Sequence, residues 1–157
     1  MEKMSVSGIA IDTNNMPIIV LKNHDGKKVL PIWVGMFEAQ AILFALEGVV
    51  PPRPLTHDLL KSIIEKMGAK VDKIIINTLQ NNTYFAMVRL SFNETSIDID
   101  SRPSDAIALA LRTDSPIFVA DHVISTITMP QHPIDDEEVK KFKDELKTLS
   151  TKDISPF

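Results

Sequence analysis

In IDSRPSDAIALALR (Ile99–Arg112) a strand gives way to a helix at a single proline. The residues that lead into it, SIDID over 96–100, alternate with the period of a strand that has one apolar face. Pro103 suits the first helical turn, because its missing N–H has no partner to lose there. AIALALR then has almost no polar face and predicts a helix buried on all sides. The mouth of this helix carries four charged residues: Asp98, Asp100, Arg102 and Asp105.

Apolar runs separated by turn residues predict strands on both sides of this stretch. These expected strands span residues 5–12, 16–22, 29–34, 69–79, 83–92 and 115–120. The Asp25-Gly26 pair and the QNN turn at 80–82 predict hairpins, and therefore antiparallel neighbours. Two further helices are expected over 36–47 and 57–67, each followed by a glycine that suits a helix end. Thr56 is the expected N-cap of the second.

The second helix, 57–67, carries one apolar stripe that is expected to pack against the core. The stripe comprises Leu59, Leu60, Ile63, Ile64 and Met67. Trp33 and the aromatic residues of 83–92 lie in expected strands, so we interpret them as core residues rather than as surfaces for base stacking. Near the C-terminus, DEEVKKFKDELKTL predicts an amphipathic helix with Val139, Phe142, Leu146 and Leu149 on one stripe.

The expected fold class follows from hairpins that sit beside helices between strands. It is α+β, a mixed, largely antiparallel β-sheet with three packed core helices and a C-terminal amphipathic helix. We expect one domain over residues 1–128, followed by a linker and helical tail over 129–157.

Composition narrows the function. Among 157 residues there is no cysteine, which excludes disulfides, thiol catalysis and cysteine-ligated metals and fits a cytoplasmic location. No long uncharged apolar run is present, so no membrane partner is expected. The formal net charge of -4 gives no global basic field. A polyanionic partner would therefore need a local cationic patch or bridging metal ions.

Individual polar residues near the helix starts leave several interpretations open. Asp105 would stabilise its helix N-terminus, but the same feature binds phosphate. Glu38 shares a helix face with alanine and isoleucine, so it needs a partner, for which Arg53 and Arg102 are the candidates. His57 opens the second helix, where an imidazole can act as a general base, bind metal or contact phosphate. RPLTHD and RPSDA both place Arg-Pro just before a helix, which suggests related architecture.

Five blocks, in this order and spacing, resemble the bifunctional nuclease domain family. They are LPIWVGMFEAQAI, PRPLTHDLL, TYFAMVRL, IDSRPSDAIALALR and PIFVA, within residues 4–123. The resemblance implies a mixed α+β domain that cuts both RNA and DNA. Its motif positions in this chain are Glu38, Arg53, Thr56, His57, Asp58, Asp100, Arg102, Ser104 and Asp105.

Within that resemblance we interpret the polar residues as parts of one cleft. The expected catalytic residues are Glu38, His57, Asp100 and Asp105, and the expected substrate-binding residues are Arg53, Arg102 and Ser104. Asp100 and Asp105 would hold Mg²⁺ or Mn²⁺, which would stabilise charge on the scissile phosphate and activate water. The expected partner is a short or single-stranded nucleic acid, because the chain lacks a basic face. A homo-oligomer is also expected.

Two other functions use the same residues. In a non-catalytic interaction or regulatory module, Glu38, Arg53, Arg102 and Asp105 would form a buried ion network that locks the helices to the sheet. A sensor of a small phosphate or nucleotide would use the helix starts without cleavage. Solvent-open carboxylates with a pKa raised by like charge would favour the enzyme, whereas buried and fully paired charges would favour the module.

Overall fold

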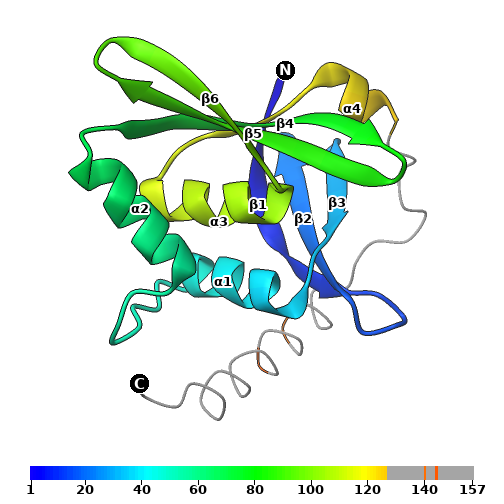
Figure 1. The fold of residues 1–157 in the computed structure, drawn as a ribbon. Helices are drawn as coiled ribbons and strands as arrows, with labels where there is room; N and C mark the ends of the chain where they lie inside the picture. The colour runs from blue at the N-terminus through cyan, green and yellow to red at the C-terminus, as the bar shows by residue number, and fades with distance from the viewer. Residues whose placement is uncertain (127–139, 141–143, 145–157) are drawn as a thin grey trace.

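The protein is described by a computed structural model, which covers residues 1–126, 140 and 144 and confirms the α+β class (Figure 1). Its strands are β1 (Glu2–Ile11), β2 (Pro17–Asn23), β3 (Val29–Trp33), β4 (Lys70–Gln80), β5 (Thr83–Phe92), β6 (Thr95–Ser101) and β7 (Ile117–Val119). Its helices are α1 (Met36–Leu46), α2 (Thr56–Lys66), α3 (Pro103–Thr113) and the short α4 (Asp121–Ser125). No helix in this described part is long and apolar enough to cross a membrane.

The strands form one sheet in the order β3-β2-β1-β7-β4-β5-β6. Every neighbouring pair is antiparallel except β4 and β7, so the sheet is mixed and largely antiparallel as predicted. The short β7 joins the β1–β3 meander to the β4–β6 meander. Asn81 and Asn82 have positive φ angles of 50° and 58°, which the predicted hairpin between β4 and β5 requires.

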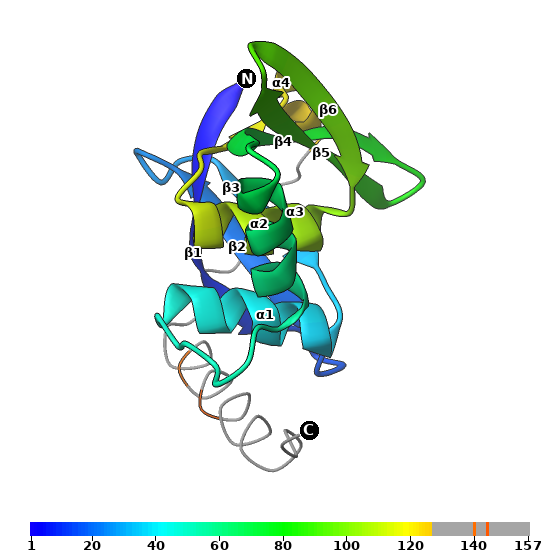
Figure 2. The same ribbon diagram turned by 60° about the vertical axis from the view of Figure 1, so that its left-hand side comes forward.

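Helix α3 lies at the centre of the domain, because both of its sides are apolar. It packs against α1, α2, β4 and β5. Figures 1 and 2 show the twisted sheet curving around α3, with α2 on its outer side. The predicted buried helix is confirmed, since every residue from Ala106 to Ala110 is buried. The N-terminal end of α3 lies close to the N-terminal ends of α1 and α2.

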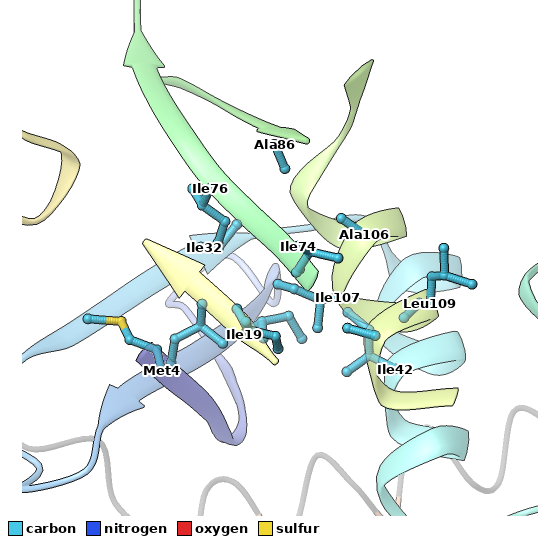
Figure 3. Close-up of a cluster of buried hydrophobic side chains, with 14 of the residues drawn as sticks. Met4, Ile19, Ile32, Ile42, Ile74, Ile76, Ala86, Ala106, Ile107 and Leu109 are labelled. Atoms are coloured by element: carbon cyan, nitrogen blue, oxygen red, sulfur yellow. The ribbon is translucent and has the colours of Figure 1, made fainter. Parts of the chain in front are cut away.

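The hydrophobic core fills the space between α1, α3 and the sheet (Figure 3). Ile19 and Ile74 come from the two meanders, and both side chains are fully buried. Ile107 of α3 and Ile42 of α1 face them and are also fully buried. The core therefore fixes the positions of α1 and α3 relative to each other.

Two predictions about α2 are wrong in whole or in part. Of the apolar stripe, Ile64 packs against the core, but the side chains of Leu59, Ile63 and Met67 are 53%, 47% and 70% exposed. Thr56 is not the N-cap, because the helix begins with Leu55 at that position. The Asp58 carboxylate accepts the backbone N–H of Leu55 at 2.9 Å and supplies the cap instead.

The interpretation of Trp33 as a core residue is also wrong. Trp33 ends β3 and is 54% exposed. Its indole N–H donates to Asp12 Oδ2 at 3.0 Å, so a hydrogen bond rather than burial holds the ring. The predicted C-terminal helix and the domain limit at residue 128 lie outside the described residues.

Candidate functional site

The starts of α1, α2 and α3 meet in one chain of four charged or titratable side chains. Arg102 Nη1 donates to Glu38 Oε1 at 3.0 Å, and Arg102 Nε donates to Asp105 Oδ2 at 2.7 Å. Asp105 Oδ1 lies 2.9 Å from His57 Nε2. Four of the residues predicted for the site therefore come together, and of the two arginines considered for Glu38, Arg102 is the partner.

Local backbone features place each of these side chains. Pro103 begins α3, so Arg102 stands at the N-cap and Asp105 in the first turn. Gly35 precedes α1 in the same way, and a Cβ at Gly35 would collide with the Glu38 carboxylate. Glycine thus lets Glu38 fold back over the start of its own helix towards Arg102.

The Asp105 carboxylate is ionised over the neutral pH range. Burial raises its pKa, but hydrogen bonds from Arg102 and His57 outweigh burial and hold the pKa below its ordinary value. An ionised carboxylate has no proton to donate, so His57 Nε2 carries the hydrogen in this bond. In the neutral imidazole the free lone pair then belongs to Nδ1. Asp105 therefore fixes the orientation of the imidazole ring.

Arg102 is held on one side and open on the other. Its side chain is 63% exposed, and the two bonds to Glu38 and Asp105 engage two of the five N–H groups of the guanidinium. The carboxylate of Asp105 also raises the pKa of Arg102, which keeps the cation charged. The remaining N–H groups are available to an anion without breaking either bond.

Two hollows flank the Glu38–Arg102 pair, and both residues line each of them. The larger, which we call the histidine cleft, has a volume of about 630 Å³ and is lined by His57, Asp105 and the exposed Phe37. The smaller, the tryptophan pocket, has a volume of about 340 Å³ and is lined by Trp33, Tyr84 and Ser104. The Glu38–Arg102 ion pair thus lies between the two hollows. Titratable side chains line the histidine cleft, whereas aromatic and neutral side chains make up most of the lining of the tryptophan pocket.

A second ion network lies at the other end of α3 and was missed in the sequence. Arg112, in the last turn of α3, donates from Nε to Asp58 at 2.8 Å. Its Nη1 and Nη2 donate to the backbone carbonyls of Ala108 and Ala41 at 2.9 and 3.0 Å. The side chain is only 8% exposed. Arg112 therefore joins α1, α2 and α3. The feature of the sequence that could have indicated this role is a single charged residue at the end of an apolar helix.

The other predicted site residues lie apart from this chain of contacts. Asp100 is exposed on β6 opposite Met87. It shares a strand face with Asp98, which binds Arg89 with two hydrogen bonds, whereas the alternate residues of β6 stand opposite the buried side chains of β5. No hydrogen bond or ion pair between described residues joins Asp100 to Asp105.

Arg53 and Ser104 also fall outside the chain of contacts. Arg53 is exposed and, within the described residues, forms no ion pair with Glu38. Ser104 is 7% exposed and lies on the wall of the tryptophan pocket. Neither Ser104 nor Ser101 caps α3, since no side chain accepts a hydrogen bond from its first turn.

The donor set does not fit a resident metal ion. Among the residues described, no group of three or more histidine, aspartate or glutamate side chains could hold a metal. Both oxygens of Asp105 already accept hydrogen bonds, and Asp100 belongs to the other face of its strand. Mg²⁺ or Mn²⁺ therefore stays a prediction from the sequence.

Comparison with known proteins places this site in a family. The sequence model for the bifunctional nuclease domain matches residues 19–132. An uncharacterized protein of Mycobacterium tuberculosis (strain ATCC 25618 / H37Rv) is 36% identical over 163 residues, covering 98% of each chain. Bifunctional nuclease 1 of Oryza sativa subsp. indica is 34% identical over 105 residues, covering 64% of this chain and 32% of that protein. Bifunctional nuclease 2 of Arabidopsis thaliana is 35% identical over a similar span.

The fold and the site define an α+β domain with a polar cleft built from three helix starts. The chain belongs to the bifunctional nuclease domain family, and the resemblance seen in its sequence blocks is confirmed. It spans about a third of the length of the plant proteins, 32% for the rice protein.

Proposed function

We propose that this protein is a nuclease that hydrolyses phosphodiester bonds in RNA and DNA. The observation that carries the proposal is the His57–Asp105 dyad in the histidine cleft, next to an exposed guanidinium that keeps free N–H groups. The family and the names of the plant relatives support the same activity. The substrate class is taken from the family, and the charge of Arg102 and the size of the cleft are compatible with it.

The reaction uses a base and a cation that this chain supplies. Because DNA lacks a 2′-hydroxyl, cleavage of both polymers cannot depend on that group, and we take water as the nucleophile. The water oxygen bonds to phosphorus while His57 Nδ1 accepts one of its protons; the P–O bond to the leaving sugar oxygen breaks, and that oxygen takes a proton from solvent water. Asp105 holds the ring and stabilises the imidazolium that forms. Arg102 donates to the phosphate oxygens and offsets the charge that develops on them. Glu38 fixes the guanidinium from the opposite side.

A divalent ion is a separate proposal with its own test. Mg²⁺ or Mn²⁺ carried in with the substrate would lower the repulsion between a polyanion and a chain of net charge -4. The proposal predicts that chelator lowers cleavage, and equal rates with and without chelator would contradict it.

The second candidate is a non-catalytic module, and the pairing of the charges favours it. Glu38, Arg102 and Asp105 are all paired, and the pKa of Asp105 is lowered rather than raised. Exposure favours the enzyme instead, because a purely structural pair has no need of an arginine that is 63% exposed. The structural task of joining the helices is already carried out by Arg112.

Cleavage of fluorescent single-stranded RNA and DNA tests the proposal. Highly purified wild-type protein would be assayed with Mg²⁺, with Mn²⁺ and with chelator, beside folded Asp105→Asn and Arg102→Ala proteins. We expect activity to co-elute with the wild-type protein and to fall at least about a hundredfold in Asp105→Asn, equivalent to about 2.7 kcal/mol of barrier. Equal activity in all three proteins would indicate a contaminant and would overturn the proposal.

A homo-oligomer and a cytoplasmic location stay predictions from the sequence. The exposed apolar side chains along α2, such as Ile63 and Met67, agree with self-association. Sedimentation equilibrium of the wild-type protein and of Ile63→Glu measures it directly. A monomer at every concentration would contradict the oligomer, and cell fractionation tests the location.

A further inference from the structure

The tryptophan pocket takes no part in the reaction described above, yet it shares a wall with the histidine cleft. Glu38 and Arg102 line both hollows, so a molecule bound to Arg102 borders each of them. Among the described residues that line the pocket, Arg102 is the one cationic side chain, and the others are aromatic, apolar or neutral apart from Glu38. The pocket therefore suits an uncharged, flat group attached to a phosphate.

A hydrogen bond holds one edge of the Trp33 ring beside this pocket. The indole N–H donates to Asp12 Oδ2, and Asp12 Oδ1 accepts the backbone N–H groups of Asn14 and Met16. The ring is thus tied to the β1–β2 turn through its polar edge. With 54% of the residue exposed, an apolar surface remains accessible to a ligand. An aromatic residue held this way loses little freedom when it stacks.

Another part of the pocket lining comes from the β4–β5 hairpin. Tyr84 and Asn82 both line the pocket, and Asn82 belongs to the hairpin turn, with a φ angle of 58°. Burial raises the pKa of Tyr84, so its hydroxyl stays protonated near neutral pH. An amide and a phenol can both donate and accept hydrogen bonds, as the edge of a nucleobase does.

We propose that the tryptophan pocket binds an unpaired nucleobase of single-stranded nucleic acid, stacked on Trp33, while the adjoining phosphate binds Arg102. This inference rests on the nuclease function proposed above and specifies its substrate. A base inside a duplex has both faces stacked and cannot enter such a pocket. The pocket volume of about 340 Å³ lies in the range of small-ligand sites.

Trp33 is the single tryptophan of the chain, so its fluorescence reports on this pocket alone. The experiment uses full-length His57→Gln protein, in which the proposed function predicts cleavage about 10²- to 10⁴-fold slower, and two labelled probes: a short oligothymidylate and an abasic phosphodiester of equal length and charge. We expect the oligothymidylate to quench Trp33 and to bind at least about tenfold more tightly than the abasic probe. Adding Trp33→Ala to this protein should remove that difference, measured by anisotropy, whereas Trp33→Phe should keep most of it.

A matched control is Phe85→Ala, because Phe85 is 40% exposed on β5 and does not line the pocket. It should leave both affinities unchanged. Equal affinity for the two probes, no binding of either, or tight base-dependent binding by Trp33→Ala would overturn the inference. If wild-type protein cleaves nucleic acid in any of these cases, the nuclease function stands and only the base subsite falls. Base-dependent quenching without cleavage by wild-type protein would support the subsite and reject the nuclease.

Discussion

Two arginines mark the two ends of α3, and their surroundings differ in a way that separates structure from function. Arg112 is 8% exposed and directs three groups of its guanidinium at Asp58 and two backbone carbonyls. Arg102 is 63% exposed and contacts only two carboxylates. Both form ion pairs of similar length. Burial, and the number of donors left over, therefore distinguishes an arginine that holds helices together from one that can bind a ligand.

Breaking the buried network should have the largest effect. Arg112→Ala leaves Asp58 without its cation and two carbonyls without their donor, so the free energy of unfolding should fall by about 3–5 kcal/mol. Denaturant unfolding measures this loss. Arg112→Lys keeps the charge without the planar fork and should lose an intermediate amount. A loss below about 1 kcal/mol would show that Arg112 is not a structural lock.

Removing the base should affect catalysis without a comparable effect on the fold. In His57→Gln the amide can still donate to Asp105, but no ring nitrogen remains to accept a proton. We expect kcat to fall by about 10²- to 10⁴-fold. The assay is multiple-turnover cleavage of single-stranded DNA, with circular dichroism as the control for folding. An unchanged kcat would exclude His57 as the base.

Changing the open arginine should weaken substrate binding more than stability. Arg102→Gln removes charge-assisted hydrogen bonds to phosphate, so kcat/KM should fall by about 10- to 100-fold. The free energy of unfolding should change by less than about 1 kcal/mol, because exposed ion pairs contribute little. If Arg102→Gln destabilised the fold as strongly as Arg112→Ala, the distinction between the two arginines would fail.

Acid should weaken the fold through carboxylates whose pKa is depressed. Burial raises the pKa of Asp58, but the Leu55 N–H and Arg112 lower it to a net value below the ordinary 3.8; the pKa of Asp105 is also lowered. The unfolded chain therefore binds these protons first, so their stabilisation is present above about pH 4 and is lost as the pH falls through the folded-state values. Unfolding experiments across this range should show a shallower decline for Arg112→Ala, and an identical decline would contradict the assignment.

Much of the fold could be predicted because local chemistry decides it. Asn81 and Asn82 favour the hairpin, and Pro103 begins α3. The apolar run after Pro103 has almost no polar face, so it is stable only when it is buried. The α2 stripe and Trp33 were misjudged for one common reason. An apolar side chain is buried only where another element covers it, and the sequence does not show which faces stay uncovered.

The site was predicted in part for a similar reason. Glu38, His57, Arg102 and Asp105 lie at helix starts, and the fold brings three helix starts together. Asp100 could not be placed, since the face on which it lies depends on the register between β5 and β6. The pairing of Arg112 with Asp58 could not be predicted either, because it depends on how α2 packs across α3.

The most direct test compares the carboxylates paired with the arginines at the two ends of α3, Asp105 and Asp58, by measuring kcat/KM on single-stranded DNA for Asp105→Asn and Asp58→Asn. Each carboxylate pairs with one of the two arginines. We expect at least about a hundredfold loss in Asp105→Asn and a change of less than about threefold in Asp58→Asn, once both are corrected for the folded fraction. Equal losses in the two variants, or none in Asp105→Asn, would contradict the assignment of the open network to catalysis.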